Sequence, residues 1–254
     1  METAVRTVSP LIRAGRVLVV GVGGLGSPVA LALAQAGVGT IGLIDPDVVE
    51  LSNLQRQILH HTPDLGRPKV VSAREKLIRI DPAIEVAVYH GRLHAGNLAT
   101  LFHTYDFVID ATDGVATKFL INDGAVLLKK PFSYGGIVQF AGQTLTVLPG
   151  KTACLRCLFP TIPSGDEVPT CQEAGIIGSL AGSLGFVQAM EAVKYLSREG
   201  VLLTDRLLTY DASASRWRTI VVKRNPRCPL CSDVPSITSL EQAGGAAEEN
   251  CAVA

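Results

Sequence analysis

Short apolar runs alternate with longer amphipathic stretches along the chain. The run at Arg16–Val20 is followed by a Gly-rich segment, by a stretch at Leu25–Ala36 with helical spacing, and by a second apolar run at Thr40–Ile44. A short apolar run bounded by turn residues is typical of a buried strand. The order strand, helix, strand therefore predicts an α/β unit at the start of the chain.

The later pattern extends this alternation. Further helices are expected at Pro68–Ile80, Gly96–His103, Ala116–Lys129 and Ala174–Ser197. Further strands are expected at Ile84–Tyr89, Phe107–Ile109, Phe132–Val138, Gln143–Leu148, Leu207–Tyr210 and Thr219–Lys223. These segments predict an α/β fold in which residues 1–232 form one domain, with a mainly parallel sheet, flanking helices and an antiparallel extension. Residues 233–254 are small, acidic and rich in Gly and Ala, and we expect a disordered tail there.

Composition narrows the classes of function. The 254 residues are 47% hydrophobic and carry no net formal charge, which suits a substantial core and argues against a dedicated nucleic-acid binder. No signal peptide is visible near Arg6 and Arg13. Two uncharged stretches, Val17–Ile44 and Ala174–Met190, are interrupted by glycines and do not predict membrane spans. We expect a cytoplasmic protein that does not bind a membrane.

The Gly-rich segment between the first strand and the first helix carries candidate chemistry. Glycines in Gly21–Gly26 allow a tight turn and let backbone N–H groups approach a phosphate, while the helix N-terminus adds partial positive charge. Asp45 follows the second strand, where a ribose hydroxyl would be held. A nicotinamide-dependent oxidoreductase fits these two features as well. A Gly-rich turn also occurs where a helix merely packs closely on a strand.

Two cations further along favour a polyphosphate ligand. Lys69 follows Pro68, which suits the first position of a helix, so the lysine charge opposes the helix dipole unless an anion lies nearby. Arg56 lies in the polar segment before them, and both side chains are expected to point at one polyphosphate. The alternative for each is a solvated surface cation. His60 and His61 are expected on the surface of the same loop.

Four of the six cysteines form two Cys-x-x-Cys pairs, Cys154 with Cys157 and Cys228 with Cys231. Two such pairs can supply four thiolates to a tetrahedral zinc ion, which leaves no open position for catalysis. A redox pair or two disulfides are the alternatives, and a reducing compartment disfavours stable disulfides. We expect a structural zinc site that ties the middle of the chain to its C-terminal part.

Several motifs together resemble a known family. GVGGLG at Gly21, DPDVVELSNLQRQ at Asp45, GRPK at Gly66 and ATDG at Ala111 are similar to the MoeB/ThiF/HesA family, the bacterial relatives of ubiquitin-activating enzymes. The resemblance covers nearly the whole chain. It implies a Rossmann-like fold with a structural zinc site, a homodimer and an ATP-dependent adenylyltransferase. The implied substrate is the C-terminal Gly-Gly carboxylate of a small ubiquitin-like sulfur-carrier protein of the molybdopterin-synthase or ThiS type, with sulfur coming from a separate donor.

The resemblance also implies roles for individual residues. Asp113 would hold magnesium together with ATP, and Arg56, Lys69 and Asp113 would carry the catalysis. Cys171 lies where some relatives bond covalently to the carrier, and a spectator thiol is the alternative. Gly114 stands where relatives often have Asn. The implied nucleotide-binding residues are Gly21, Gly23, Gly24, Gly26, Asp45, Ser52, Asn53, Gln55, Arg56, Lys69, Asp113 and Gly114.

One element of the family pattern has no counterpart near the N-terminus. Relatives carry an arginine well before the Gly-rich turn that reaches the neighbouring subunit's phosphates, but only 20 residues precede Gly21 here. Three explanations stay open: the start is assigned too late, Arg6 or Arg13 takes the role across a dimer, or the chain is a non-catalytic scaffold that binds nucleotide and carrier. The pathway, whether molybdopterin, thiamin or thiolated tRNA, is open too.

Overall fold

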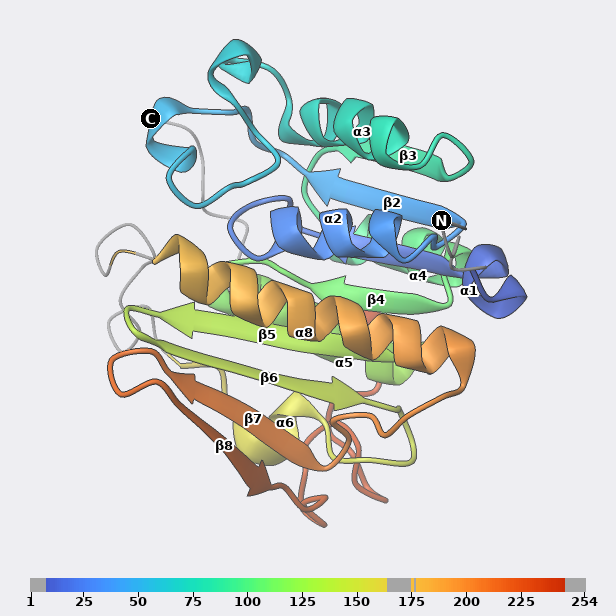
Figure 1. Cartoon of the computed structure of the whole chain (residues 1–254). Helices are drawn as coiled ribbons and strands as arrows, with labels where there is room; N and C mark the ends of the chain where they lie inside the picture. The colour runs from blue at the N-terminus through green and yellow to red at the C-terminus, as the bar shows by residue number, and fades with distance from the viewer. Residues whose placement is uncertain (1–7, 164–174, 176, 245–254) are drawn as a thin grey trace, which may run out of the picture.

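An eight-stranded sheet runs through the computed structural model, which describes residues 8–163, 175 and 177–244. Its strands lie in the order β3-β2-β1-β4-β5-β6-β7-β8 (Figure 1). The strands are β1 (Arg16–Val20), β2 (Thr40–Asp45), β3 (Glu85–His90), β4 (Phe107–Asp110), β5 (Phe132–Val138), β6 (Ala141–Val147), β7 (Arg206–Asp211) and β8 (Arg216–Val221). The helices are α1 (Pro10–Ala14), α2 (Gly26–Gln35), α3 (Lys69–Ile80), α4 (Ala95–Thr104), α5 (Val115–Leu127), α6 (Leu155–Leu158) and α8 (Gly178–Ser197), with 3₁₀ turns η1 (Leu51–Asn53), η2 (Thr62–Asp64) and η4 (Leu240–Gln242).

The order in which the chain adds parallel strands to the sheet reverses at β1. Val17 of β1 pairs with Ile41 of β2 on one side and with Phe107 of β4 on the other. The chain runs outward from β1 to β2 and β3 and then returns past β1 to β4 and β5, all of them parallel. Ligands of open α/β sheets bind beyond the carboxyl ends of the strands at such a reversal. The arrangement confirms the predicted Rossmann-like sheet, and β6, β7 and β8 form the predicted antiparallel extension.

Helices cover both faces of the parallel strands (Figure 1). The core on one face is formed with α2, α3 and α8, and the core on the other with α4 and α5. Val17 and Val19 of β1 belong to the first core, whereas Leu18 and Val20 belong to the second. Because both faces are covered, β1 is apolar at every position after Arg16, as a parallel strand should be.

The boundaries of most elements agree with the predicted ones to within a few residues. Pro68, expected as the first residue of a helix, precedes α3, which begins at Lys69. The segment predicted as a tail is described as far as Gly244. There Ile237 and Leu240 pack against the core beside α5, and the Gly244 N–H donates to Asp123 at 3.0 Å. The second half of this described segment therefore lies against the domain, through Ile237, Leu240 and Gly244.

Within the part of the chain that the structure describes, no helix has both the length and the apolar character that crossing a membrane requires.

Candidate nucleotide site and cysteine centre

A cavity of about 690 Å³ opens at the carboxyl ends of β1, β2 and β4. Its walls come from the Gly-rich turn before α2, from the segment between β2 and α3, and from the turn between β4 and α5. The predicted residues that line it are Gly21, Gly23, Gly24, Asp45, Asn53, Arg56, Lys69, Asp113 and Gly114. Segments far apart in the sequence thus bring most of the predicted site to one place.

The glycines of the turn have two different tasks. Gly21 has φ +89°, and a Cβ there would lie 2.8 Å from the Ala111 carbonyl oxygen. A Cβ on Gly26 would lie 1.9 Å from the Gly21 carbonyl oxygen, so Gly26 packs within the turn and does not line the cavity. Gly23 and Gly24 line the cavity and have no such overlap. Two glycines shape the turn, and the other two keep its backbone open to a ligand.

Asp45 ties the Gly-rich turn to the segment that follows β2. Its Oδ2 accepts the Val22 N–H at 2.6 Å, and its Oδ1 accepts the Asp47 N–H at 2.8 Å. Burial raises the pKa of Asp45, and the nearby charge of Lys69 opposes this rise. Each carboxylate oxygen keeps a further lone pair. Asp45 can therefore still accept a hydrogen bond from a ribose hydroxyl in the cavity.

The two predicted cations both reach the cavity. Lys69 is buried at the first position of α3, and its Nζ pairs with Asp47 Oδ2 at 2.7 Å. The positive charge of Lys69 is unfavourable at a helix N-terminus, and the carboxylate of Asp47 compensates it. Asp47 also holds the Lys69 ammonium group at the cavity wall. Arg56 donates from Nη1 to the Ser52 carbonyl at 3.1 Å. The arrangement supplies two positive charges to one cavity.

Ser52 and Gln55 do not line the cavity, contrary to what the resemblance implies. Both are exposed, and the Ser52 hydroxyl donates to Glu50 at 3.3 Å. The reason lies in the tight turns that start at η1, because a 3₁₀ turn has three residues and places i and i+3 on one side. Asn53 and Arg56 share the inner side, so Ser52 and Gln55 share the outer side.

The turn between β4 and α5 separates two carboxylates. Asp113 is exposed at the cavity wall, whereas Asp110 is fully buried and pairs with Lys118 at 3.3 Å. Burial raises the pKa of Asp110, and Lys118 opposes the rise. Thr112 is fixed from both sides, because its N–H and hydroxyl donate to Asp110 while its carbonyl accepts from Lys118 at 2.6 Å. Of these two carboxylates, Asp113 is the one that lines the cavity.

Sequence reasoning missed several residues of this region. The cavity is also lined by Asp47, Glu50, Gln57, Arg92, Thr112, Thr117 and Lys118. Lys118 lies in the first turn of α5, and a cation near a helix start was the signal that could have found it. His60 was expected on the surface, and this is wrong, since it is 2% exposed between Val22 and Ser72. His61 is exposed, as expected. The sequence does not reveal the polar partners that allow His60 to be buried.

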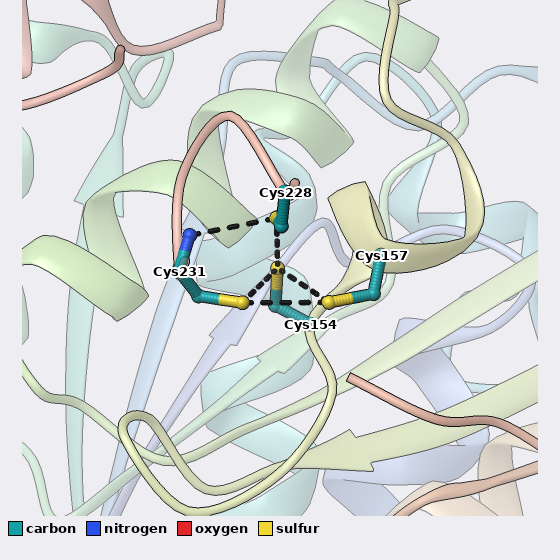
Figure 2. A group of neighbouring side chains, drawn as sticks. All are labelled: Cys154, Cys157, Cys228 and Cys231. Carbon is teal, nitrogen blue, oxygen red and sulfur yellow. Dashed lines mark hydrogen bonds between the residues drawn. The ribbon is translucent and has the colours of Figure 1, made fainter. Parts of the chain in front are cut away.

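Four cysteines converge on one point at the antiparallel side of the domain (Figure 2). The Sγ atom of Cys154 lies 3.9, 3.7 and 3.6 Å from those of Cys157, Cys228 and Cys231, and the Cys157 and Cys231 sulfurs are 3.4 Å apart. Sulfurs about 2.3 Å from a tetrahedral zinc ion are about 3.8 Å from one another. The donor set and its spacing therefore fit zinc, and none of the four thiols is in a disulfide.

Other residues of the sequence prediction lie elsewhere. Cys171 and Arg6 fall outside the described residues. Arg13, on α1, pairs with Asp81 at 2.9 Å. Helix α1 lies at the amino ends of β1 and β2, whereas the cavity opens at the carboxyl ends of these strands (Figure 1). Arg13 thus does not contribute to the cavity of its own subunit.

The doubly covered sheet and the Gly-rich turn, with a cavity at the carboxyl ends of the strands, define an α/β protein with a Rossmann-like fold. The chain belongs to the ThiF family, whose family model matches residues 9–230. It is 44% identical over 230 residues to the "Sulfur carrier protein adenylyltransferase" of Thermus thermophilus, a match that covers 89% of this chain and 85% of that protein.

Two kinds of longer relative match as well. The chain is 43% identical to the "Adenylyltransferase and sulfurtransferase MOCS3" of Anopheles gambiae, and it spans about half of that protein, 52%. It is 42% identical to a "Probable adenylyltransferase/sulfurtransferase MoeZ" of Mycobacterium tuberculosis, of which it spans 58%. These names confirm the predicted family and the predicted class of enzyme, an adenylyltransferase.

The fold has a counterpart among solved structures. A crystal structure of Escherichia coli MccB with MccA-N7isoASN superposes with a TM-score of 0.77 at 21% sequence identity, covering 88% of this chain and 68% of that one. At this level of identity the similarity concerns the fold alone.

Proposed function

We propose that this chain is an ATP-dependent adenylyltransferase that activates the C-terminal Gly-Gly carboxylate of a small ubiquitin-like sulfur-carrier protein. The observation that carries the proposal is the meeting of Arg56, Lys69 and Asp113 with the Gly-rich turn in one cavity. The name of the Thermus relative supports a sulfur carrier as substrate, and the name of the MOCS3 relative supports the adenylyltransferase activity. A nicotinamide-dependent oxidoreductase fits less well, because its cofactor does not call for two cations and an exposed carboxylate at the phosphates.

The residues suggest how the nucleotide is held. Asp45 accepts from the ribose, and the open backbone at Gly23 and Gly24 receives phosphate oxygens at the start of α2. Arg56 and Lys69 neutralise the charge that builds up as pyrophosphate departs. Asp113 offers the hard oxygen ligands that magnesium prefers, and the ion would supply further positive charge beside the phosphates. The four-cysteine centre would hold a structural zinc ion away from this chemistry.

The reaction needs positioning more than proton transfer. The carrier's terminal carboxylate is ionised at pH 7 and attacks the α-phosphorus without a general base. The new bond joins carboxylate oxygen to phosphorus, the bond to pyrophosphate breaks, and a carrier acyl-adenylate results. The site contributes by holding the two anions in line and compensating their charge. A separate sulfur donor then converts the adenylate to a thiocarboxylate.

The wider assignment follows the family. We place the reaction in the cytoplasm, because four free thiols suit a reducing compartment. We also propose a homodimer that buries part of α8, where Phe186 and Met190 are 45% and 56% exposed. In this dimer Arg6 or Arg13 would contribute a positive charge to the neighbouring subunit's site.

Pyrophosphate exchange into ATP tests the proposal. Exchange should require a carrier with an intact Gly-Gly end, and a carrier lacking the last glycine is the control. Arg56→Ala and Asp113→Ala should each lower the exchange rate at least ~100-fold, the effect of losing a charge partner in the transition state. Arg74→Ala, an exposed arginine of α3, is the matched control and should keep the rate. If the protein binds ATP and carrier but shows no exchange, it is a non-catalytic scaffold and the proposed enzyme activity is refuted.

A further inference from the structure

We infer that His60 is a positioning residue for the phosphate-facing turn of the nucleotide site. It holds the carbonyl of Val22 from behind the turn and thereby directs the N–H of Gly23 into the cavity. The inference rests on the proposed nucleotide site, and it concerns a side chain that does not line the cavity itself.

The hydrogen bonds of His60 determine which ring nitrogen carries the proton. Nε2 lies 3.2 Å from the Val22 carbonyl oxygen, and Nδ1 lies 2.9 Å from the Ser72 hydroxyl oxygen. A carbonyl oxygen can only accept, so the proton must be on Nε2. Nδ1 of the neutral ring can then accept from the Ser72 hydroxyl.

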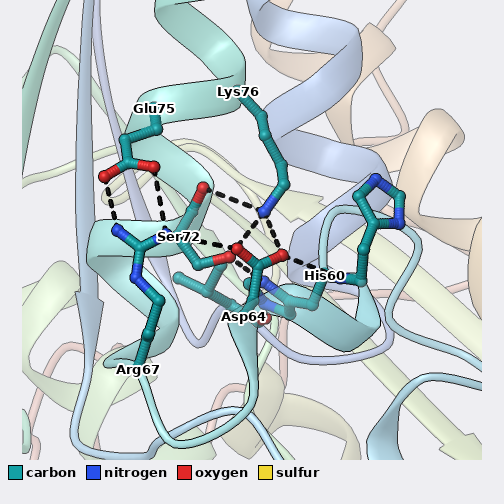
Figure 3. A network of polar contacts seen from close by, with 8 residues as sticks. His60, Asp64, Arg67, Ser72, Glu75 and Lys76 are labelled. Carbon is teal, nitrogen blue, oxygen red and sulfur yellow. Dashed lines mark hydrogen bonds and ion pairs between the residues drawn. The ribbon is translucent and has the colours of Figure 1, made fainter.

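Further residues surround the Ser72 hydroxyl. Lys76 Nζ donates to the Ser72 oxygen at 2.7 Å and also pairs with Asp64 (Figure 3). Because the ammonium group can only donate, the Ser72 hydrogen is left for an acceptor, and both His60 Nδ1 and the Asp64 carboxylate lie within its reach. The pKa of His60 is lowered from 6.5 to about 4, mainly by burial; the hydrogen bond to the Val22 carbonyl opposes this, the charges of Lys76 and Lys69 add to it, and Asp64 opposes them. The ring is therefore neutral at pH 7 and keeps one defined tautomer.

The peptide between Val22 and Gly23 links the hydrogen bond of His60 to the orientation of the Gly23 N–H. In a trans peptide the carbonyl and the following N–H point in opposite directions, and the described backbone has no cis bond. With the Val22 carbonyl held by His60, and by the Ser27 hydroxyl at 3.3 Å, the Gly23 N–H points the other way. Gly23 lines the cavity, and none of the backbone acceptors in the described residues is bonded to its N–H. This N–H is available to a phosphate oxygen.

The two neighbouring peptides of the turn have separate anchors. The N–H of Val22 belongs to the peptide that Asp45 holds, and its carbonyl belongs to the one that His60 holds. Loss of the His60 hydrogen bond should therefore affect phosphate contacts and leave the Asp45 side of the site in place. Removing His60 is predicted to weaken the binding of ATP but not that of adenosine, which has no phosphate.

The experiment compares ATP and adenosine binding by calorimetry, without carrier, in the full chain. His60→Phe keeps a planar ring and removes both nitrogens, and it should weaken ATP about tenfold, the effect of one hydrogen bond to a charged group, with adenosine changed less than twofold. His60→Gln can place an N–H at a similar reach and should restore most of the ATP affinity. Ser72→Ala removes the partner of Nδ1, so the ring is held from one side only; it should give an intermediate loss, which keeps the inference testable if His60→Phe does not fold.

The outcomes separate this inference from the proposed reaction. Equal weakening of ATP and adenosine, or no weakening of either in a folded His60→Phe, would overturn the positioning role. Wild-type protein that binds ATP no more tightly than adenosine would overturn it too, since the turn would then make no phosphate contact. Wild-type protein that prefers ATP yet shows no carrier-dependent pyrophosphate exchange would refute the adenylyltransferase, while the ratio of ATP to adenosine binding would still decide the role of His60.

Discussion

Replacing Arg156 by Met should destabilise the protein more than any single surface substitution. Arg156 Nε and Nη2 each lie 2.7 Å from a carboxylate oxygen of Asp123, and the side chains are 6% and 0% exposed. The pair joins α5 to α6, the short helix that follows Cys154 and contains Cys157. Arg156→Met leaves the Asp123 carboxylate buried without its counter-charge. Breaking a buried ion pair from one side costs about 3–5 kcal/mol.

A second substitution, at Asp123, removes the buried charge that Arg156→Met leaves, and the hydrogen-bond partners of Asp123 determine which residue should replace it. Its oxygens also accept from Asn122 Nδ2 at 2.9 Å and from the Gly244 N–H at 3.0 Å. An apolar residue would leave these donors unpaired, so Asp123→Asn is the better change, because an amide oxygen keeps one acceptor and carries no charge. The double variant Asp123→Asn with Arg156→Met should be more stable than Arg156→Met alone by about 2 kcal/mol, since no charge stays buried.

Thermal and urea unfolding at pH 7 provide the assay. A loss of 3–5 kcal/mol in a chain of this size lowers Tm by about 6–20 °C. Arg74→Met, at an exposed position of α3, is the matched control and should shift Tm by no more than ~2 °C. If Arg156→Met lies within 1 kcal/mol of the wild type, or if the double variant is no more stable than the single one, the reasoning about an uncompensated buried charge is refuted.

Three further predictions follow from other parts of the molecule. Elemental analysis should find about one zinc per chain, and Cys228→Ser should lower both the zinc content and Tm, because metal binding contributes to folding; zinc-free protein of unchanged Tm would contradict this. The pKa of His60 is lowered from 6.5 to about 4 in the folded chain, so the unfolded chain binds more protons between these values and stability falls as pH falls from 6.5 to 4; His60→Gln should flatten this slope in urea titrations, and an unchanged slope would count against it. Light scattering at micromolar concentration should show a dimer that Met190→Glu converts to monomer, whereas a monomeric wild type would remove α8 as the interface.

The elements that local patterns determine were predictable. The apolar run of β1, covered on both faces, has the boundaries expected from the sequence. The two Cys-x-x-Cys pairs converge as predicted, in the arrangement by which two such pairs supply four thiolates to one tetrahedral metal site. The Gly-rich turn and Asp45 meet because the carboxyl ends of β1 and β2 lie side by side.

What could not be predicted depends on partners distant in sequence. His60 seemed a surface residue because nothing near it in the chain indicates Val22, 38 residues earlier, as its acceptor. Asp123 and Arg156 are separated by 33 residues, so their pairing needs the fold. Ser52 was expected at the phosphates for a local reason. An extended loop and a 3₁₀ turn direct different residues of the same segment toward the cavity, and the sequence did not predict the turn.

The antiparallel extension contains the only tryptophan of the chain, Trp217 of β8. Its ring stacks on Tyr210 of β7 with centroids 4.2 Å apart, and it is 43% exposed. Strand β8 is four strands beyond β4, about 19 Å for a spacing of roughly 4.8 Å between strands. Tryptophan fluorescence therefore reports on the outer edge of the sheet and not on the cavity. A nucleotide entering the cavity should leave this emission unchanged, whereas a protein that covers β8 should shift it to shorter wavelength, so the two binding events can be followed separately without an added dye.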